Sequence, residues 1–351
     1  MVQETLPSVS VVVISYNMAR ELKRTLYSLS TRMQVGINKS QYEIIVVDNG
    51  SLDTAYLEDC RSIESNIIVI NMDNASQSPS AAVNKGIRHA KANIIGVMID
   101  GARIASPGLL QNVLLASKLH HRPVVSTLGF HLGREQQMVS IKKGYNQDIE
   151  DKLLDDVDWT ADGYRLFDIS VFASSSNKGF FLPISESNAL FMNRDMWLEL
   201  GGFDQNFACP GGGLVNLDTY VRACTLQDAQ LIILLGEGTF HQVHNGVATN
   251  SQTSPWEEFH KEYVRLRGKP FAQASIRPWY FGTLAPQVMP MIEQSARKAM
   301  NGGAKSSKFI RRSRNRPQHR ACPAGSFPPD GFAKRCCDSV VRLLGLFGQK
   351  K

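Results

Sequence analysis

The chain has 351 residues, of which 43% are hydrophobic and 20% charged, a composition typical of a soluble globular protein. No apolar run approaches the roughly 20 residues that cross a bilayer, and residues 1–7 do not resemble a secretory signal. The six cysteines lack paired CxxC spacing, which predicts reduced thiols in a cytoplasmic protein and argues against a cysteine metal site.

The net charge of +7 is concentrated near the C-terminus. Residues 301–320 carry seven lysines and arginines and no acidic residue, so the rest of the chain is close to neutral. We therefore expect no nucleic-acid binding by the globular part. The basic segment predicts a disordered tail past about residue 300, with a short apolar helix at residues 340–347. The tail is either solvated or in peripheral contact with an anionic cytoplasmic membrane face.

The first third of the chain alternates apolar runs with helical patterns. The strands are expected at residues 9–14, 44–47, 67–70 and 94–99, and the helices at 19–29, 54–63, 80–90 and 107–119. Runs of consecutive β-branched residues such as Ile44–Val47 are typical of strands buried on both faces, as in a parallel sheet. This order predicts a doubly wound α/β domain.

Polar side chains follow three of these strands. Ser15 and Asn17 follow the first, Asp48 ends the second, and Asp100 ends the fourth. Since ligands bind outside the carboxyl ends of strands in open α/β sheets, these residues predict a binding site at one sheet edge. The plain alternative is that the aspartates only cap the helices that follow.

The second half of the chain is less regular. Strands are expected at residues 123–129, 186–194 and 231–235, and helices at 195–200, around Asp218 and Arg222, and at 256–265. We expect one domain in two halves (1–120 and 121–280), followed by a basic, partly disordered extension (281–351).

Several motifs together resemble the family 2 glycosyltransferases. Residues 9–17 (VSVVVISYN) and 42–53 (YEIIVVDNGSLD) carry most of the resemblance, which covers about residues 8–245. Residues 84–87 (NKGI), Gly201-Gly202-Phe203-Asp204 and Asp218 with Arg222 fit it too. The resemblance implies a GT-A fold, which is a Rossmann-like, mostly parallel sheet flanked by helices. It implies that residues 1–120 form the nucleotide-sugar-binding half and that the less regular residues 121–280 form the acceptor-binding, catalytic half.

The resemblance also implies roles for individual residues. Asp48 would bind the base of a UDP- or dTDP-sugar, with Asp53 shaping the pocket. Ser15, Tyr16 and Asn17 would lie along the base and ribose. The acceptor would be a hydroxyl of a glycan or lipid-linked molecule in polysaccharide or cell-envelope synthesis, glycosylated with inversion of the anomeric centre.

Asp100 would be the first carboxylate of the family's Asp-x-Asp metal motif, which here reads Asp100-Gly101-Ala102-Arg103. The second aspartate is absent, so two arrangements stay open. His241 or His244 could complete a site for Mn²⁺ or Mg²⁺ with Asp100, or Arg103 could hold the diphosphate directly.

The catalytic base is also displaced, because the Glu-Asp pair usual before the acceptor-side helix is missing. We expect Asp218 to be the base, with Asp204 and Glu186 as reserves, while the plain alternative pairs Asp218 with Arg222 on one helix face. The rival to an enzyme is a degenerate, non-catalytic nucleotide- or glycan-binding module. A nucleotidyltransferase is disfavoured because no Gly-rich phosphate loop follows the first strand.

Overall fold

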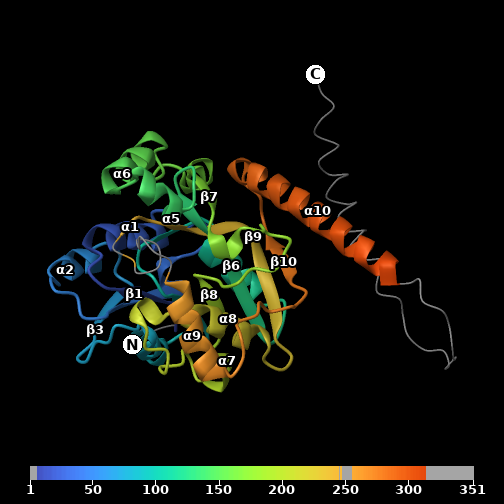
Figure 1. Ribbon diagram of the computed structural model, residues 1–351. Coiled ribbons are helices and arrows are strands. Elements are labelled where there is room, and N and C mark those ends of the chain that lie inside the picture. Colours follow the sequence, from blue (N-terminus) through green and yellow to red (C-terminus); the bar gives the residue numbers. More distant parts are fainter. Residues whose placement is uncertain (1–5, 245, 247–254, 314–351) are drawn as a thin grey trace.

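The computed structural model describes residues 6–244, 246 and 255–313, and only the backbone of 302–313. A single sheet has the strand order β10-β9-β6-β8-β4-β1-β2-β3, with β5 added beside β9 and β7 beside β6 (Figure 1). The strands are β1 (Val9–Ser15), β2 (Tyr42–Asp48), β3 (Ile67–Asn71), β4 (Ile94–Met98), β5 (Arg103–Ala105), β6 (Pro123–Leu132), β7 (Ser170–Phe172), β8 (Leu190–Asn193), β9 (Gln230–His241) and β10 (Trp279–Gly282).

Helices flank this sheet on both faces. They are α1 (Ala19–Leu29), α2 (Tyr56–Arg61), α3 (Ser80–His89), α4 (Leu109–Ala116), α5 (Gln137–Ser140), α6 (Gln147–Asp156), α7 (Arg194–Leu200), α8 (Val215–Cys224), α9 (Trp256–Arg267) and α10 (Met289–Ser313). The first four strands and their helices appear as predicted, which confirms the mixed α/β class. None of the described helices has the length and apolarity to pass through a bilayer.

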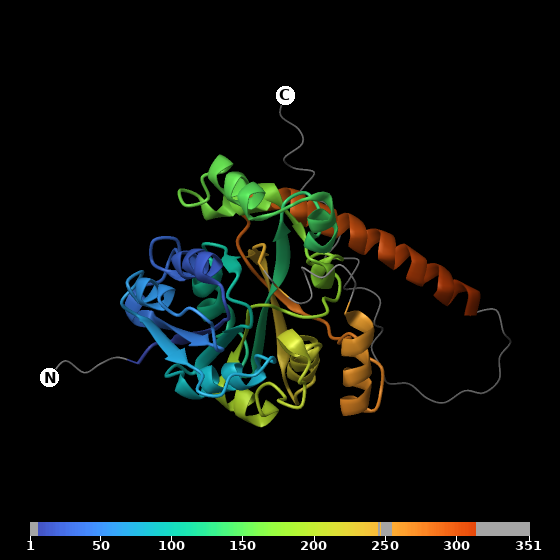
Figure 2. The same cartoon turned by 60° about the vertical axis from the view of Figure 1, so that its left-hand side comes forward.

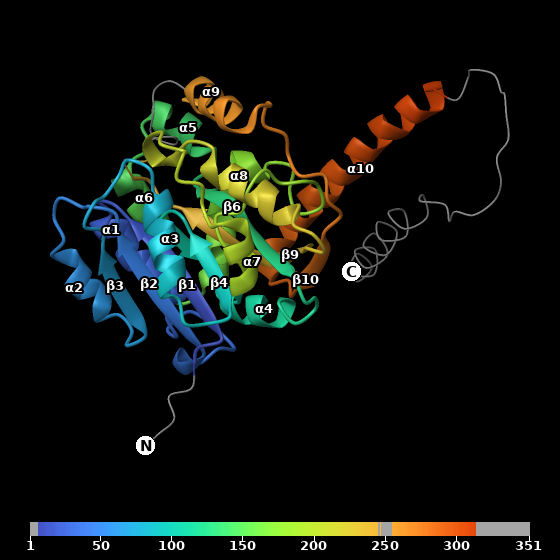
Figure 3. The ribbon, with the colours of Figure 1, turned by 90° about the horizontal axis from the view of Figure 1, so that it is seen from below.

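Alternation along the strands explains the two layers of helices. On β1, Val11 and Val13 belong to the apolar cluster that includes α1, α2 and α4, whereas Val12 and Ile14 belong to the cluster that includes α3, α7 and α8. Each strand therefore buries both of its faces, which is why its sequence is continuously apolar. The β1–β4 region lies on one side of the molecule and β9, β10 and α10 on the other (Figures 1 and 3).

The parallel pairing brings the polar strand ends together. β1 pairs in parallel with β2 and β4, and its register places Ser15 beside Asp48. β8 is antiparallel to both β4 and β6, and β9 runs parallel to β6. The segment around α5, α6 and β7 lies at one end of this sheet (Figures 1 and 2).

Several elements differ from the sequence expectations. β9 continues to His241 instead of ending near residue 235, because Gly236, at φ 81°, lets the strand pass through an irregularity and resume pairing with β6. β8 begins at Leu190, so Glu186 lies in the loop before it. The short strands β5, β7 and β10 escaped prediction.

The C-terminal extension contains the end of a helix. α10 continues to Ser313, so the described backbone of residues 301–313 is helical, and the disorder expected of the tail stays a prediction. The helix projects away from the body of the molecule (Figures 1 and 3). The expected apolar helix at residues 340–347 lies outside the described residues.

Candidate active site

Asp48 is enclosed by its own turn. Its Oδ2 accepts hydrogen bonds from the backbone N–H groups of Gly50 (3.1 Å) and Ser51 (2.9 Å), and its Oδ1 accepts from the hydroxyls of Ser51 (2.5 Å) and Tyr56 (3.3 Å). Ser15 Oγ lies 3.0 Å from the same Tyr56 hydroxyl. Asp48 is buried, so its carboxylate shapes this loop and has little capacity left for a ligand.

Asn49, which sequence reasoning did not single out, has the opposite character. Its Nδ2 donates to Ser76 O at 2.8 Å, which fixes the orientation of the amide. Its Oδ1 is buried and has no hydrogen-bond partner in the part of the chain that the structure describes. Because a buried polar atom without a partner is costly, this oxygen is a candidate acceptor for a ligand N–H at the strand end.

The remaining donor-side residues lie around the same loop. Asn17 adopts a left-handed backbone (φ 50°), and its Oδ1 accepts from Leu52 N at 2.9 Å, which joins the ends of β1 and β2. Tyr16 is 52% exposed. Asp53 is exposed and accepts from Ala55 N at 2.9 Å, so its carboxylate contacts its own turn.

Asp100, His241 and His244 converge on one point. Oδ2 of Asp100 lies 2.9 Å from Nε2 of His241 and 3.5 Å from Nε2 of His244, and the two Nε2 atoms are 3.1 Å apart. The short strand β5 makes this possible, because it pairs Arg103 with His241 and so brings the segment after β4 against the end of β9. The three ligand atoms all lie within 4.8 Å of one another.

A neighbouring amide sets the tautomer of His241. Its Nδ1 donates to Oε1 of Gln137, an oxygen that can only accept, and the backbone N–H of Gln137 donates to Nδ1 of His131 at 2.9 Å. Burial, with Arg103 nearby, lowers the pKa of His241 to about 4. The neutral ring therefore turns a lone pair on Nε2 toward Asp100.

This arrangement fits a divalent cation. Two imidazole nitrogens and a carboxylate oxygen lie within 4.8 Å of one another, so all three can direct lone pairs at a single ion. Metal-binding histidines typically donate their other ring N–H to an oxygen, as His241 does to Gln137. Imidazole suits Mn²⁺ better than Mg²⁺, which prefers oxygen ligands.

Helix α6 holds the backbone between the two histidines. Oε2 of Glu150 accepts from the N–H of Val243 at 2.8 Å, and burial raises the pKa of Glu150 to about 7. Asp151 accepts from Arg24 at 2.7 Å and also pairs with Arg20, both on α1. Contacts between α6 and α1 therefore fix the loop that carries His244.

Arg103 directly follows Ala102, the residue at the position of the missing second aspartate. It is buried, and its Nε lies 3.6 Å from Oδ2 of Asp100. Among the described residues, its Nε and Nη1 atoms have no hydrogen-bond partner. A buried guanidinium with free N–H groups beside a cation site is suited to phosphate oxygens, which it can bind in bidentate fashion.

Asp218 is held by two guanidiniums. Arg222 Nε donates to its Oδ2 at 2.7 Å, and Arg267 donates from Nε to Oδ1 and from Nη2 to Oδ2, both at 2.6 Å. Asp204 pairs with the same Arg267 at 2.8 Å. The i,i+4 pair with Arg222 was the plain alternative for Asp218, and it is present.

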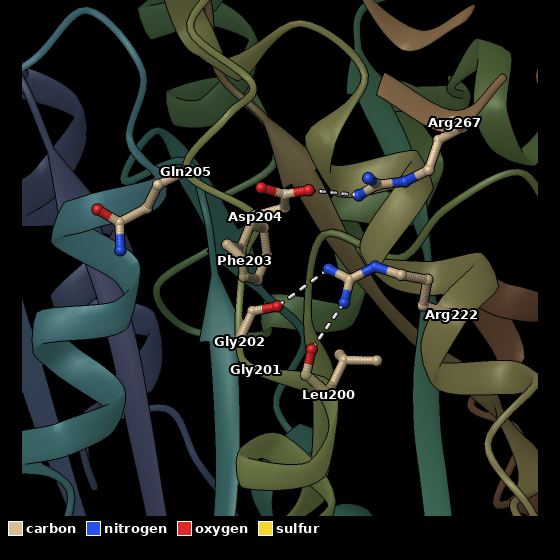
Figure 4. A pocket seen from close by; sticks show the side chains of 8 residues that line it. All are labelled: Leu200, Gly201, Gly202, Phe203, Asp204, Gln205, Arg222 and Arg267. Atoms are coloured by element: carbon tan, nitrogen blue, oxygen red, sulfur yellow. Dashed lines mark hydrogen bonds and ion pairs between the residues drawn. The ribbon is translucent and has the colours of Figure 1, made fainter. Parts of the chain in front are cut away.

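These arginines border a cavity of about 480 Å³. Figure 4 shows Arg267 directed at Asp204 and Arg222 directed at the backbone oxygens of Leu200 and Gly202. The residues that line the cavity are Leu200, Gly201, Gly202, Phe203, Asp204, Gln205, Arg222 and Arg267. The guanidiniums are already paired, and the cavity includes none of Asp100, His241 and His244, so it is separate from the candidate metal site.

Comparison with known proteins shows what this chain resembles. Residues 10–172 match the model of Glycosyl transferase family 2, which confirms the predicted resemblance for this part of the chain. Validoxylamine A glucosyltransferase of Streptomyces hygroscopicus is 27% identical over 226 residues, 62% of this chain and 52% of that protein. Glycosyltransferase AglE of Haloferax volcanii is 34% identical over 28% of this chain and 31% of its own length. The chain thus spans about half, or less, of these relatives.

Solved structures give more distant matches. Staphylococcus aureus TarS in complex with UDP-GlcNAc is 16% identical, with a TM-score of 0.47, over 74% of this chain and 65% of that one. A mannosyltransferase from Pyrobaculum calidifontis, solved with GDP-Man and Mn²⁺, is 13% identical with a TM-score of 0.45, over 99% of this chain and 82% of that one. At these scores the likeness adds no detail to the site.

Proposed function

We propose that this protein transfers a sugar from a nucleotide-sugar donor to an acceptor hydroxyl, with inversion of the anomeric centre. The observation that carries the proposal is the convergence of Asp100, His241 and His244 beside the buried Arg103, whose Nη1 has no hydrogen-bond partner among the described residues. Gly101, next to Asp100, packs against the backbone of Ile14 at the end of β1. This proximity supports a diphosphate-binding group beside a base-binding loop, as a family 2 domain would require.

The loop favours a base that presents an N–H group. The free Oδ1 of Asn49 is an acceptor, as an imino N–H requires, and uracil and thymine both carry one. UDP- and dTDP-sugars therefore remain the expected donors. Asp48 stabilises the loop through its hydrogen bond with the backbone N–H of Ser51, and Asn17 joins the loop to β1. The exposed Tyr16 ring and Asp53 border it.

The diphosphate would lie over Asp100 and Arg103. Asp100, His241 and His244 would hold Mn²⁺, which when bound neutralises charge that develops on the departing nucleoside diphosphate. The free N–H groups of Arg103 would donate to phosphate oxygens from the other side. Both arrangements left open by the sequence are therefore combined in this proposal.

The predicted base Asp218 remains a prediction, and its surroundings weigh against it. A general base must release its lone pair to the acceptor hydroxyl, whereas Asp218 is buried and engaged by Arg222 and Arg267. Removing the carboxylate would leave two partly buried guanidiniums without their shared counter-charge. We propose a structural role for Asp218, in fixing α9 to α8.

We also propose a cytoplasmic location with peripheral contact to an anionic membrane through the basic C-terminal segment. The support is the run of seven basic residues between 301 and 320, each contributing about 1 kcal/mol near an anionic surface. A glycan or lipid-linked acceptor of the cell envelope would suit that position. Flotation with phosphatidylglycerol vesicles should be lost when the seven residues are changed to glutamine, and unchanged flotation would refute the contact.

The test of the function is thermal stability of the purified chain with nucleoside diphosphates and nucleotide sugars, each with Mn²⁺, Mg²⁺ or EDTA. A ligand that binds only the folded state raises its stability by mass action. We expect UDP or dTDP to raise the thermal stability of the chain when Mn²⁺ is present. We also expect the chain to release the nucleoside diphosphate from the matching nucleotide sugar. Nucleotide binding without turnover of any donor would favour the non-catalytic module instead.

A further inference from the structure

Glu186 is a carboxylate that neither the metal cluster nor an arginine pair uses. It lies in the loop before β8, and the next residue fixes that loop to β6: Ser187 Oγ accepts from Thr127 N at 3.1 Å and donates to Thr127 O at 3.0 Å. The backbone at Glu186 is therefore held in place, although its side chain is only half-buried.

Asn216, in the first turn of α8, orients this carboxylate. Its Nδ2 donates to Oε2 of Glu186 at 2.7 Å and lies 3.3 Å from the carbonyl oxygen of Ser187. Within the described part of the chain, Oε1 of Glu186 has no hydrogen-bond partner and is open to solvent. One oxygen is thus anchored and the other is free.

Arg103 relates Glu186 to the metal cluster. A Cβ at Gly129 would lie 3.8 Å from Nη1 of Arg103 and 3.3 Å from Nδ2 of Asn188, so both side chains border this point of β6. Oδ1 of Asn188 lies in turn 3.5 Å from Nδ2 of Asn216, the group that holds Glu186. Glu186 is therefore linked to the surroundings of Arg103 through Asn216 and Asn188, and it lies outside the Asp100 and histidine cluster.

The other buried or half-buried carboxylates nearby are committed. Asp204 and Asp218 pair with Arg267, and Glu150 holds the backbone of Val243. Glu237 is enclosed by side chains of β5's end, α4 and the segment after α6, which are Ser106, Asn112 and Tyr164. Only a carboxylate with a free, accessible oxygen can accept a proton from an entering hydroxyl.

We propose that Glu186 is the general base of the transfer reaction, with Asn216 as its positioning residue. This inference rests on the proposed function. As the acceptor oxygen forms its bond to the anomeric carbon, Oε1 of Glu186 takes the hydroxyl proton. The bond from that carbon to the diphosphate oxygen breaks, and its electron pair leaves with the nucleoside diphosphate.

The experiment compares wild type with Glu186→Gln and with the exchange variant Glu186→Gln/Asn216→Asp. Release of UDP from UDP-glucose and UDP-GlcNAc is measured with Mn²⁺, with alkyl glycosides or water as acceptor, and UDP binding is measured separately by calorimetry. Glu257→Gln is the matched control, since Glu257 is exposed and pairs only with Lys261 on α9 among the described residues.

We expect E186Q to lower turnover about 10²- to 10⁴-fold, while UDP affinity stays within about threefold of wild type. The exchange variant should regain at least tenfold over E186Q, because its new carboxylate replaces an amide 2.7 Å from the original oxygen. If the exchange variant does not fold, rescue of Glu186→Ala by formate replaces it as the second measurement.

Three outcomes would overturn the assignment. Wild-type turnover in E186Q would exclude Glu186 as the base while leaving the transferase function intact. A loss of UDP affinity that matches the loss of turnover would place Glu186 in the donor site instead. A wild-type chain that binds UDP and releases it from no donor would refute the proposed function, and the role of Glu186 with it.

Discussion

The Nε2 atom of His241 lies 2.9 Å from Oδ2 of Asp100, although the other nitrogen of the same ring already donates its proton to Gln137. A neutral imidazole in this tautomer directs a lone pair at a carboxylate, which is repulsive unless a cation lies between them. Although burial opposes protonation, the Asp100 carboxylate raises the pKa of His244, so a protonated His244 can fill that need without metal. A divalent cation would fill it more completely.

Metal binding should depend on Gln137 as well as on the ligands. We expect Gln137→Leu to weaken Mn²⁺ binding about 10- to 100-fold, because His241 loses the partner that fixes its tautomer. Gln137→Glu should retain binding, and His244→Ala should lose most of it. The measurement is electron paramagnetic resonance of free Mn²⁺, with the exposed His89→Gln as control. Equal affinity in wild type and Gln137→Leu would contradict this role.

Base recognition should follow Asn49 more than Asp48. We expect Asn49→Ala to weaken UDP binding about tenfold or more, because a hydrogen bond to a buried acceptor contributes about 1 kcal/mol or above. The loss should be smaller for CDP, since cytosine lacks the imino N–H. Calorimetric titration measures the affinity for both nucleotides. Asp53→Asn, on the exposed side of the loop, is the comparison. An equal loss for UDP and CDP would count against base reading by Asn49.

Asp218→Asn should act on stability. The substitution leaves the partly exposed guanidiniums of Arg222 and Arg267 facing a neutral amide, which costs about 1–3 kcal/mol. Chemical denaturation should therefore show a loss of unfolding free energy of this size. The double variant Asp218→Asn/Arg267→Met should recover part of it, because one unpaired cation is removed. A stable Asp218→Asn chain that binds UDP normally and transfers nothing would restore Asp218 as the base.

Folding stability should fall as the solution is made less acidic. Burial raises the pKa of Glu237 from its ordinary value of 4.5 to about 7, so the folded chain keeps a proton that the unfolded chain releases. Its stabilising effect is complete below about pH 4.5 and is lost as the pH rises through about 7, at up to about 1.4 kcal/mol per pH unit. Glu150, with the same direction of shift, adds to the slope.

Glu237→Gln isolates that contribution. The neutral side chain keeps most of the contacts with Ser106, Asn112 and Tyr164, so roughly half of the slope between pH 5 and 7 should disappear. Urea unfolding at several pH values gives the comparison. A slope identical to that of wild type would show that Glu237 is ionised in the folded protein across this range.

The pattern of apolar residues predicted the first part of the fold, residues 1–120, well. The apolar runs that become β1, β2, β3 and β4 are short, uninterrupted and followed by helical periodicity, so period and length identify each element. The same pattern failed in two places. Glycines interrupt β9, and β5 contains only three residues. Such strands form because a neighbouring strand pairs with them, and their own propensity is weak.

The sequence by itself determined the four βα units and the polar residues at their ends, because burial on both faces of a parallel strand leaves a direct record in consecutive apolar residues. Only the tertiary structure decided what those residues do. Pairing of β5 with β9 joins Asp100 to His241 across 141 positions of the chain. Arg267 reaches Asp218 across 49 positions, and Asn216 reaches Glu186 across 30. Contacts of this kind depend on how distant elements pack together, so they cannot be predicted from residue spacing along the chain.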